Sequence, residues 1–233
     1  ALIKGERQKM ANTLITENQK LVTEAVLPQR PSRKGRDYQQ ISLYKEVNPL
    51  DWEDWRWQMK NRITKLEQIS QVVNLTPEEE DGIKNAKGRM AMAVTPYWAT
   101  LLDPDDPNCP IRRQCIPTQN EFHISPYEMA DPCGEDTDSP VPHLVHRYPD
   151  RVLLLATESC AMYCRHCTRR RLVGHEEKID NSPNRWDAAI EYIRSNKKVR
   201  DVLISGGDPL TLEDEVLEEL IKKLRAIPHL EFL

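Results

Sequence analysis

The sequence predicts an α/β protein, with a helical N-terminal region over residues 42–150 and the first part of a (β/α) barrel over residues 151–233. Two observations give this fold class. After residue 150, short apolar runs alternate with segments of helix length, which is typical of βαβ units and a parallel sheet. Before residue 103, Asn or Thr followed by Pro marks the start of each expected helix. Residues 1–41 are interpreted as a polar, helix-prone leader and a basic linker.

Three helices are expected between residues 48 and 103. The first runs over residues 49–69, because apolar residues recur there at three- and four-residue steps. Asn48 is its expected cap, with Asp51 as the alternative. The second opens with Thr76 to Glu79, which has the pattern of a capping box, and a short third helix starts at Thr95. The tryptophans of the first helix are interpreted as packing residues rather than as a cofactor platform.

A stretch rich in Pro, Asp and Gly follows, over residues 103–150. Loops of this length in compact domains are usually functional or disordered. We expect an ordered wrap with one short helix near residues 111–115. Its cysteines Cys109, Cys115 and Cys133 are interpreted as ordinary thiols.

The barrel part is expected to contain strands over residues 152–156, 201–205 and 230–233, with helices over 186–196 and 212–227. Active sites of (β/α) barrels lie at the C-terminal ends of the strands. Both polar motifs of this region come directly after a predicted strand. The sequence therefore places a candidate site at this end of the sheet.

The first of these motifs holds Cys160, Cys164 and Cys167 in a C-x3-C-x2-C spacing. Three thiols on one loop can converge on a metal centre. Iron–sulfur clusters are normally held by four thiolates, so a set of three suggests an iron left free for another ligand. The alternative is a closed Cys3His zinc site completed by His166 or His175.

Composition limits the class of protein. The chain has 233 residues and a net charge of −4, which argues against a nucleic-acid partner for the whole chain. Its mean hydropathy is −0.67, and no apolar run approaches the roughly 20 residues that a membrane-spanning helix needs. Six cysteines in a chain of this length do not fit a small disulfide scaffold, and reduced thiols indicate the cytoplasm.

Three strings carry a resemblance to a known family. C-A-M-Y-C-R-H-C-T-R-R-R, with H-R-Y-P-D-R upstream and S-G-G-D-P-L downstream, resembles the lysine 2,3-aminomutase branch of the radical S-adenosylmethionine enzymes. The resemblance runs from about Ser42 to the last residue. It implies a partial (β/α)6 radical S-adenosylmethionine barrel that stops here after about the third strand. We therefore expect an N-terminal fragment that is poorly stable alone and inactive.

The resemblance implies the first two cofactors and their ligands. Cys160, Cys164 and Cys167 would bind a [4Fe–4S] cluster, and its fourth iron would be chelated by S-adenosylmethionine. The residues implied at the methionine end of S-adenosylmethionine are Ser205, Gly206, Gly207 and Asp208. Read without the resemblance, Gly-Gly-Asp is a common turn between a strand and a helix.

Pyridoxal 5′-phosphate is the third cofactor that the resemblance implies, with Arg147, Tyr148 and Arg151 as its contacts. The alternative is that these arginines only pair with acidic neighbours such as Asp150. Arg169 would bind the substrate α-carboxylate. No catalytic residue is assigned, because the lysine that holds pyridoxal phosphate is expected beyond the last residue, as is a zinc site between subunits.

Two positions depart from the pattern of the family. His143 stands where a glycine is usual, and histidine is unfavourable there if the position needs a positive φ. Cys133 stands where an apolar residue is expected.

The preferred function is conversion of L-lysine to L-β-lysine by 1,2-amino migration. Glutamate 2,3-aminomutase is the alternative within the family, and a zinc-stabilised RNA-binding module is the alternative from another class. The implied partners are a small amino acid, an electron donor such as flavodoxin or ferredoxin, and further copies of the full-length chain, with no nucleic acid and no membrane.

Overall fold

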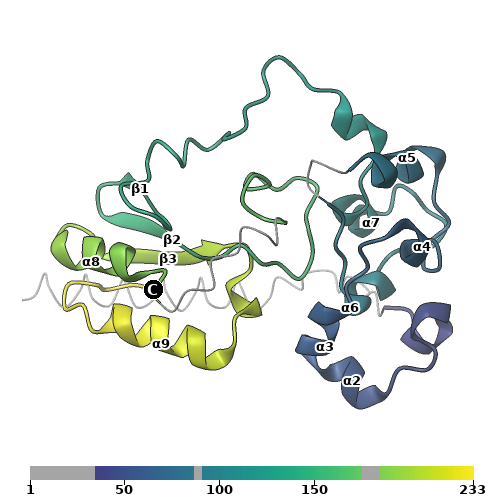
Figure 1. Ribbon diagram of the computed structural model, residues 1–233, viewed down its shortest axis with the longest axis horizontal. Coiled ribbons are helices and arrows are strands. Elements are labelled where there is room, and N and C mark those ends of the chain that lie inside the picture. Colours follow the sequence, from purple (N-terminus) through teal and green to yellow (C-terminus); the bar gives the residue numbers. More distant parts are fainter. Residues whose placement is uncertain (1–34, 87–90, 175–183) are drawn as a thin grey trace, which may run out of the picture. The chain divides into compact units, whose positions relative to one another are not determined.

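The computed structural model describes residues 35–86, 91–174 and 184–233, and residues Gly35–Leu233 belong to one unit by their contacts. The leader and most of the linker predicted over residues 1–41, and also His175, lie outside the described residues. The first part of the unit consists of short helices (Figure 1). They are η1 (Tyr38–Gln40), η2 (Ser42–Tyr44), α2 (Pro49–Glu53), α3 (Trp55–Lys60), α4 (Leu66–Ile69), α5 (Pro77–Asn85), α6 (Pro96–Thr100), α7 (Pro110–Cys115) and η3 (Gln119–Phe122).

A three-stranded sheet with two longer helices follows. Its elements are β1 (Leu144–Tyr148), β2 (Arg151–Thr157), α8 (Asp187–Ser195), β3 (Asp201–Gly206), η5 (Pro209–Thr211) and α9 (Asp214–Arg225). None of the described helices is both long and apolar enough to cross a membrane.

The sheet is mixed: the predicted strands that form β2 and β3 are parallel, as expected, whereas the antiparallel strand β1 was not predicted. Its order is β1-β2-β3; β2 and β3 are parallel, but β1 and β2 form an antiparallel hairpin. The H-R-Y-P-D-R string, predicted to precede the first strand, forms the end of β1 and the tight turn at Pro149 and Asp150. Pro followed by Asp is a turn-forming pair. The cysteines therefore follow the second strand of the chain rather than the first.

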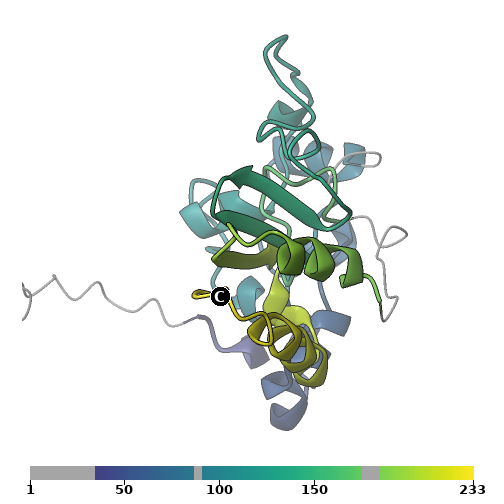
Figure 2. The ribbon, with the colours of Figure 1, turned by 90° about the vertical axis from the view of Figure 1, so that its left-hand side faces the viewer.

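One face of the sheet is covered by α8 and α9, which lie on the same side of the strands (Figure 2). Alternate residues of β2 enter this core, because successive side chains of a strand point to opposite faces. The inward residues predicted for α8 and the apolar stripe of α9 pack against these strand residues. The core residues are Leu144, Val152, Leu154, Ala156, Val202, Ala189, Ile190, Ile193, Leu220 and Leu224. Residues 230–233 make a single parallel bridge to β3 rather than a full strand.

The long helix predicted over residues 49–69 is wrong, because the chain divides it into α2, α3 and α4. Asp54 has an extended backbone (φ −81°, ψ 115°), and its carboxylate accepts a hydrogen bond from the amide of Arg56 at 2.9 Å. Short acidic side chains favour such caps over a continuous helix. Further along, Ile63 leaves helical geometry to pair with Val94 in an antiparallel bridge.

The other helix starts agree with the predictions. Thr76 and Glu79 form the expected capping box of α5, and Thr95 caps α6. The predicted short helix near residues 111–115 is α7. The tryptophan of α2 packs as predicted, since Tyr38 stacks on Trp52 with 4.0 Å between ring centroids.

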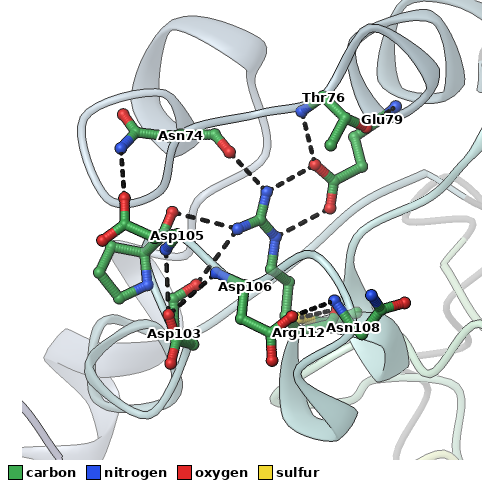
Figure 3. Close-up of polar contacts among 10 residues, drawn as sticks. Asn74, Thr76, Glu79, Asp103, Asp105, Asp106, Asn108 and Arg112 are labelled. Atoms are coloured by element: carbon green, nitrogen blue, oxygen red, sulfur yellow. Dashed lines mark hydrogen bonds and ion pairs between the residues drawn. The ribbon is translucent and has the colours of Figure 1, made fainter.

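A buried ion pair joins α5 to α7 (Figure 3). Arg112 donates from Nε and Nη2 to the two carboxylate oxygens of Glu79, at 2.8 and 2.6 Å. Its remaining hydrogens reach the carbonyls of Asn74, Asp103 and Pro104 at 2.7 to 3.2 Å. All five donors of the guanidinium therefore have an acceptor, which is what a fully buried arginine requires.

Candidate functional site

The three-cysteine loop leaves the sheet at the C-terminal end of β2. Thr157, the last residue of the strand, accepts a hydrogen bond at its hydroxyl from the amide of Ser159 at 3.1 Å. Cys160, Cys164 and Cys167 are all free thiols and all half-buried. The amide of Cys167 donates to the carbonyl of Cys164 at 3.0 Å, which curls the loop back on itself.

Backbone hydrogen bonds fix this loop against the helical region. The amide of Tyr163 donates to the carbonyl of Ala93 at 3.0 Å, and the amide of Arg165 donates to Gln114 at the end of α7 at 2.8 Å. The guanidinium of Arg165 also binds both carboxylate oxygens of Glu121, at 2.9 and 2.6 Å. The loop is therefore held by residues far away in the sequence.

Arg62 also contacts the cysteine loop. The sequence alone did not identify this residue as part of the site. Its Nη1 donates to the carbonyl of Cys160 at 2.8 Å and lies 3.4 Å from the hydroxyl of Tyr163. The residue belongs to no motif, and only the fold brings it to the cysteines.

The S-G-G-D turn at the C-terminal end of β3, which includes the last two residues of the strand, packs directly against the cysteine loop. The amide of Gly207 donates to Thr157 at 2.6 Å, and the amide of Asp208 donates to Ser159 at 2.7 Å. A Cβ on Gly207 would lie 2.2 Å from the carbonyl oxygen of Ser159 and 3.0 Å from Sγ of Cys160. Gly206 has φ +114°, which favours glycine. Both motifs predicted at strand ends are thus in contact.

Asp208 also behaves as expected if this motif is an ordinary turn between a strand and a helix. Its carboxylate accepts from the amide of Leu210 at 3.1 Å and caps η5. Its charge still acts on the neighbouring cysteine.

Burial is the main cause of the raised pKa values of two thiols in the loop, Cys160 and Cys164. It raises the pKa of Cys160 to about 12, and Asp208 and the other two thiols add to that shift, while the positive charge of Arg62 opposes it. Burial, followed by the charge of Cys167, also raises the pKa of Cys164. Cys160 is close enough to both other thiols to be influenced by their charges, and binding of a metal would have to displace the protons of Cys160 and Cys164.

Three soft thiol donors on one anchored loop suit an iron–sulfur centre. Among the described residues, no group of three or more His, Cys, Asp or Glu side chains is placed closely enough to hold a single metal ion. For the predicted Cys3His alternative, His166 is exposed and His175 lies outside the described residues.

The hairpin arginines border a separate cavity of about 200 Å³ on the face of the sheet opposite to α8 and α9. Arg147, Tyr148 and Arg151 line it together with the apolar side chains of Leu153 and Leu203. Tyr148 and both arginines are exposed, so their polar groups are accessible.

Both hairpin arginines have acidic partners. Arg147 pairs with Asp138 at 2.9 Å, and Arg151 pairs with Asp201 at 2.5 Å. Asp150, the acid named from the sequence, instead accepts a hydrogen bond from Arg200. The arginine of each hairpin pair is exposed and its acidic partner half-buried, so water weakens both pairs.

Arg169 lies between two residues from distant segments. Its Nε and Nη2 donate to Oε1 of Glu135 at 2.9 and 2.7 Å, and its Nη1 lies 3.4 Å from the hydroxyl of Ser205. The fold thus joins two predicted site residues, Arg169 and Ser205. Glu135 is buried and was missed, because its role depends on a contact 34 residues along the chain.

The three consecutive arginines do not all point the same way, as predicted, since Arg169 and Arg171 reach Glu135 and Arg170 does not. Arg171 also lies near Glu135, with 3.7 Å between Nη2 and Oε2, and pairs with Asp131 at 3.2 Å. Arg170 is exposed and donates to the carbonyl of Cys167 instead.

His143 has the positive φ that its replacement of a glycine suggested. Its φ is 62°, in the left-handed region that side chains with a Cβ rarely occupy. Its ring lies 3.8 Å from the carboxylate of Glu158, which precedes the cysteine loop.

Comparisons with known proteins agree with this geometry. A family model described as a 4Fe-4S single cluster domain matches residues 150–229. L-lysine 2,3-aminomutase of Clostridium subterminale is 54% identical over 192 residues, which cover 82% of this chain and 46% of that protein. The enzyme of the same name from Bacillus subtilis (strain 168) is 47% identical over 198 residues, covering 85% and 42%.

A relative with a different printed name also matches. Glutamate 2,3-aminomutase of Clostridioides difficile (strain 630) is 40% identical over 183 residues, which cover 78% of this chain and 43% of that protein. The chain spans about half the length of the curated relatives it matches.

Proposed function

The chain belongs to the lysine 2,3-aminomutase family, and from this premise we propose that it carries the cluster-binding part of a radical S-adenosylmethionine amino-acid 2,3-aminomutase. The proposed reaction converts L-lysine to L-β-lysine by moving the amino group from C2 to C3. The observation that carries the proposal is the direct contact between the cysteine loop and the S-G-G-D turn.

We assign the cluster to Cys160, Cys164 and Cys167. A bound [4Fe–4S] cluster with S-adenosylmethionine supplies the radical chemistry that protein side chains lack. The turn from Ser205 to Asp208 would hold the methionine end of S-adenosylmethionine. Its two glycines support this role because backbone can approach a ligand closely where no Cβ intervenes.

The cavity beside the hairpin is our proposed site for pyridoxal 5′-phosphate. Arg147 and Arg151 would bind the phosphate by bidentate hydrogen bonds, and Tyr148 would contact the flat ring. The two arginines are themselves exposed, although Asp138 and Asp201 are half-buried, so exchange of these pairs for a phosphate costs little.

Arg169 would bind the substrate carboxylate with the edge of its guanidinium that Glu135 does not occupy. Glu135 accepts from Nε and Nη2, which holds the plane of the group and leaves Nη1 directed to Ser205. Such an arrangement orients a carboxylate without movement of the arginine.

L-glutamate is the second candidate substrate, supported by the relative from Clostridioides difficile. For either substrate, the chain as part of the longer enzyme would work in the cytoplasm with an electron donor such as flavodoxin or ferredoxin, and as a homo-oligomer. Turnover of L-lysine and of L-glutamate by the longer enzyme distinguishes the two substrates.

Anaerobic reconstitution with iron and sulfide tests the cluster assignment. We expect about four irons per chain and a brown protein that cleaves S-adenosylmethionine when dithionite supplies electrons. Replacement of Cys160, Cys164 or Cys167 by Ala should remove most of the iron, whereas the matched control Cys133→Ala should retain it. A colourless chain that binds one zinc ion and RNA would contradict the proposal.

A further inference from the structure

Arg62 lies two residues after the end of α3, and its charged side chain reaches the cysteine loop. Besides its hydrogen bond to the carbonyl of Cys160, its guanidinium carbon lies 5.5 Å from the centroid of the Tyr163 ring. Its Nε donates to the carbonyl of Met59 at 3.1 Å, in the last turn of α3. One side chain thus joins the helical region to the first cysteine and to the residue before the second.

The position of Arg62 is fixed on both sides. The next residue, Ile63, is fully buried and pairs with Val94 through two backbone hydrogen bonds of 2.7 and 3.0 Å. Tyr163 is also buried, and its amide is bound to Ala93 in the same segment as Val94. The guanidinium is therefore held beside the loop by the fold, and its charge cannot move far from Cys160.

A positive charge held there would favour an electron-rich centre. One-electron reduction converts a [4Fe–4S]²⁺ cluster to [4Fe–4S]⁺, so the cluster becomes more negative by one unit. Nearby charge, hydrogen bonds and burial set the potentials of such clusters. A cation in a partly buried site acts more strongly than one in solvent, because water screens it less.

On the basis of the proposed function, we propose that Arg62 is a positioning residue for Cys160 and that its charge raises the reduction potential of the cluster. The electron itself comes from an external donor, which is dithionite in the experiment below.

The test is a redox titration of the reconstituted chain, followed by the electron paramagnetic resonance of the reduced cluster. Arg62→Gln removes the charge but keeps an amide donor. We expect this replacement to lower the equilibrium constant for reduction of the cluster about tenfold, which lowers its reduction potential by about 59 mV for one electron. Arg62→Lys keeps the charge, and we expect its reduction equilibrium to stay within about twofold of wild type.

Arg56→Gln is the matched control, because Arg56 lies on α3, is exposed and pairs with Glu213 at the surface. Its removal should leave the potential unchanged, since exposed charges are screened. Circular dichroism and iron content of each variant establish that it is folded and loaded.

The possible results separate this inference from the proposed function. A wild-type chain that takes up no cluster overturns both. A loaded Arg62→Gln chain with the wild-type potential overturns the role of the charge, and a folded variant that takes up less iron than Arg56→Gln supports the positioning role. If Arg62→Gln does not fold, Arg62→Lys provides the test. This variant keeps the positive charge, so an equilibrium constant for reduction that is more than tenfold below that of wild type would contradict the proposal.

Discussion

Two arginine–glutamate pairs of the same chemistry lie in different regions of the molecule. In the helical region Arg112 and Glu79 have side chains that are 0% and 5% exposed, and all five guanidinium donors are bound (Figure 3). Near the candidate site Glu135 is equally buried, but the side chain of Arg169 is 21% exposed. Within the described part of the chain, Nε and Nη1 of Arg171 have no hydrogen-bond partner.

This difference distinguishes an arginine that supports the fold from one that can bind a ligand. Buried donors normally have acceptors, so a saturated guanidinium has nothing left to offer to a ligand. Near the site, Arg169 and Arg171 share the carboxylate of Glu135, and two nitrogens of Arg171 have no hydrogen-bond partner among the described residues. An anion such as a substrate carboxylate would complete that set, which is why we place the ligand there.

The largest predicted effect is the loss of the saturated pair. Glu79→Ala leaves the charge of Arg112 buried without a counter-ion, and this should lower the free energy of unfolding by about 3–5 kcal/mol. Chemical denaturation measures it. Glu80→Ala on the same helix removes an exposed partner of Lys84 and should cost less than about 0.5 kcal/mol. Equal losses of unfolding free energy in Glu79→Ala and Glu80→Ala would show that the buried pair does not support the fold more than an exposed pair does.

High pH should destabilise the helical region through a buried thiol. Burial raises the pKa of Cys115 to about 12. Above the unfolded pKa of about 8.5 the unfolded chain releases this proton while the folded chain keeps it, so stability falls as pH rises, by up to about 1.4 kcal/mol per pH unit. Denaturation of wild type and Cys115→Ala at pH 9 and pH 11 should show the smaller fall in the variant. Parallel falls would mean that Cys115 does not titrate this way.

Two glycine replacements sharpen the division between the regions. A Cβ on Gly82 would lie 2.5 Å from the carbonyl oxygen of Pro117, whereas one on Gly207 would meet the cysteine loop. Both Gly→Ala variants should lose about 1–3 kcal/mol of stability, because backbone must shift. Only Gly207→Ala should take up less iron per folded chain, and an equal loss of iron in Gly82→Ala would contradict this.

Replacement of the arginine at the site should affect stability much less than replacement of Glu79. Arg169→Ala leaves Arg171 to pair with Glu135, so the free energy of unfolding should change by less than about 1 kcal/mol. The same variant of the longer enzyme should lose affinity for its amino-acid substrate. A loss of stability as large as that of Glu79→Ala would show that Arg169 serves the fold.

Local chemistry made much of this structure predictable. The caps at Thr76 and Thr95, the strand before the cysteines and the turn at Gly206 all depend on residues within a few positions of one another. The sequence also pointed to His143 as a position to check for a positive φ, because it replaces a glycine of the family pattern, and its φ is 62°.

Contacts between distant segments account for what the sequence did not reveal. Arg62 meets Cys160 across 98 residues, and nothing in its neighbourhood marks it as part of a site. The helix predicted over residues 49–69 failed for this reason only in its second half, where the bridge between Ile63 and Val94 outweighs local helical periodicity. Its first break is local, at the cap of Asp54. The antiparallel strand β1 was missed because its pairing partner, rather than its own composition, defines it.

The central claim is that Cys160, Cys164 and Cys167 hold a cluster with one iron free of thiolate. The most direct measurement is the electron paramagnetic resonance spectrum of the reduced, reconstituted chain before and after addition of S-adenosylmethionine. We predict that the spectrum changes, because the added molecule binds the iron that no cysteine occupies. An iron-loaded chain whose spectrum is identical with and without S-adenosylmethionine would contradict the account.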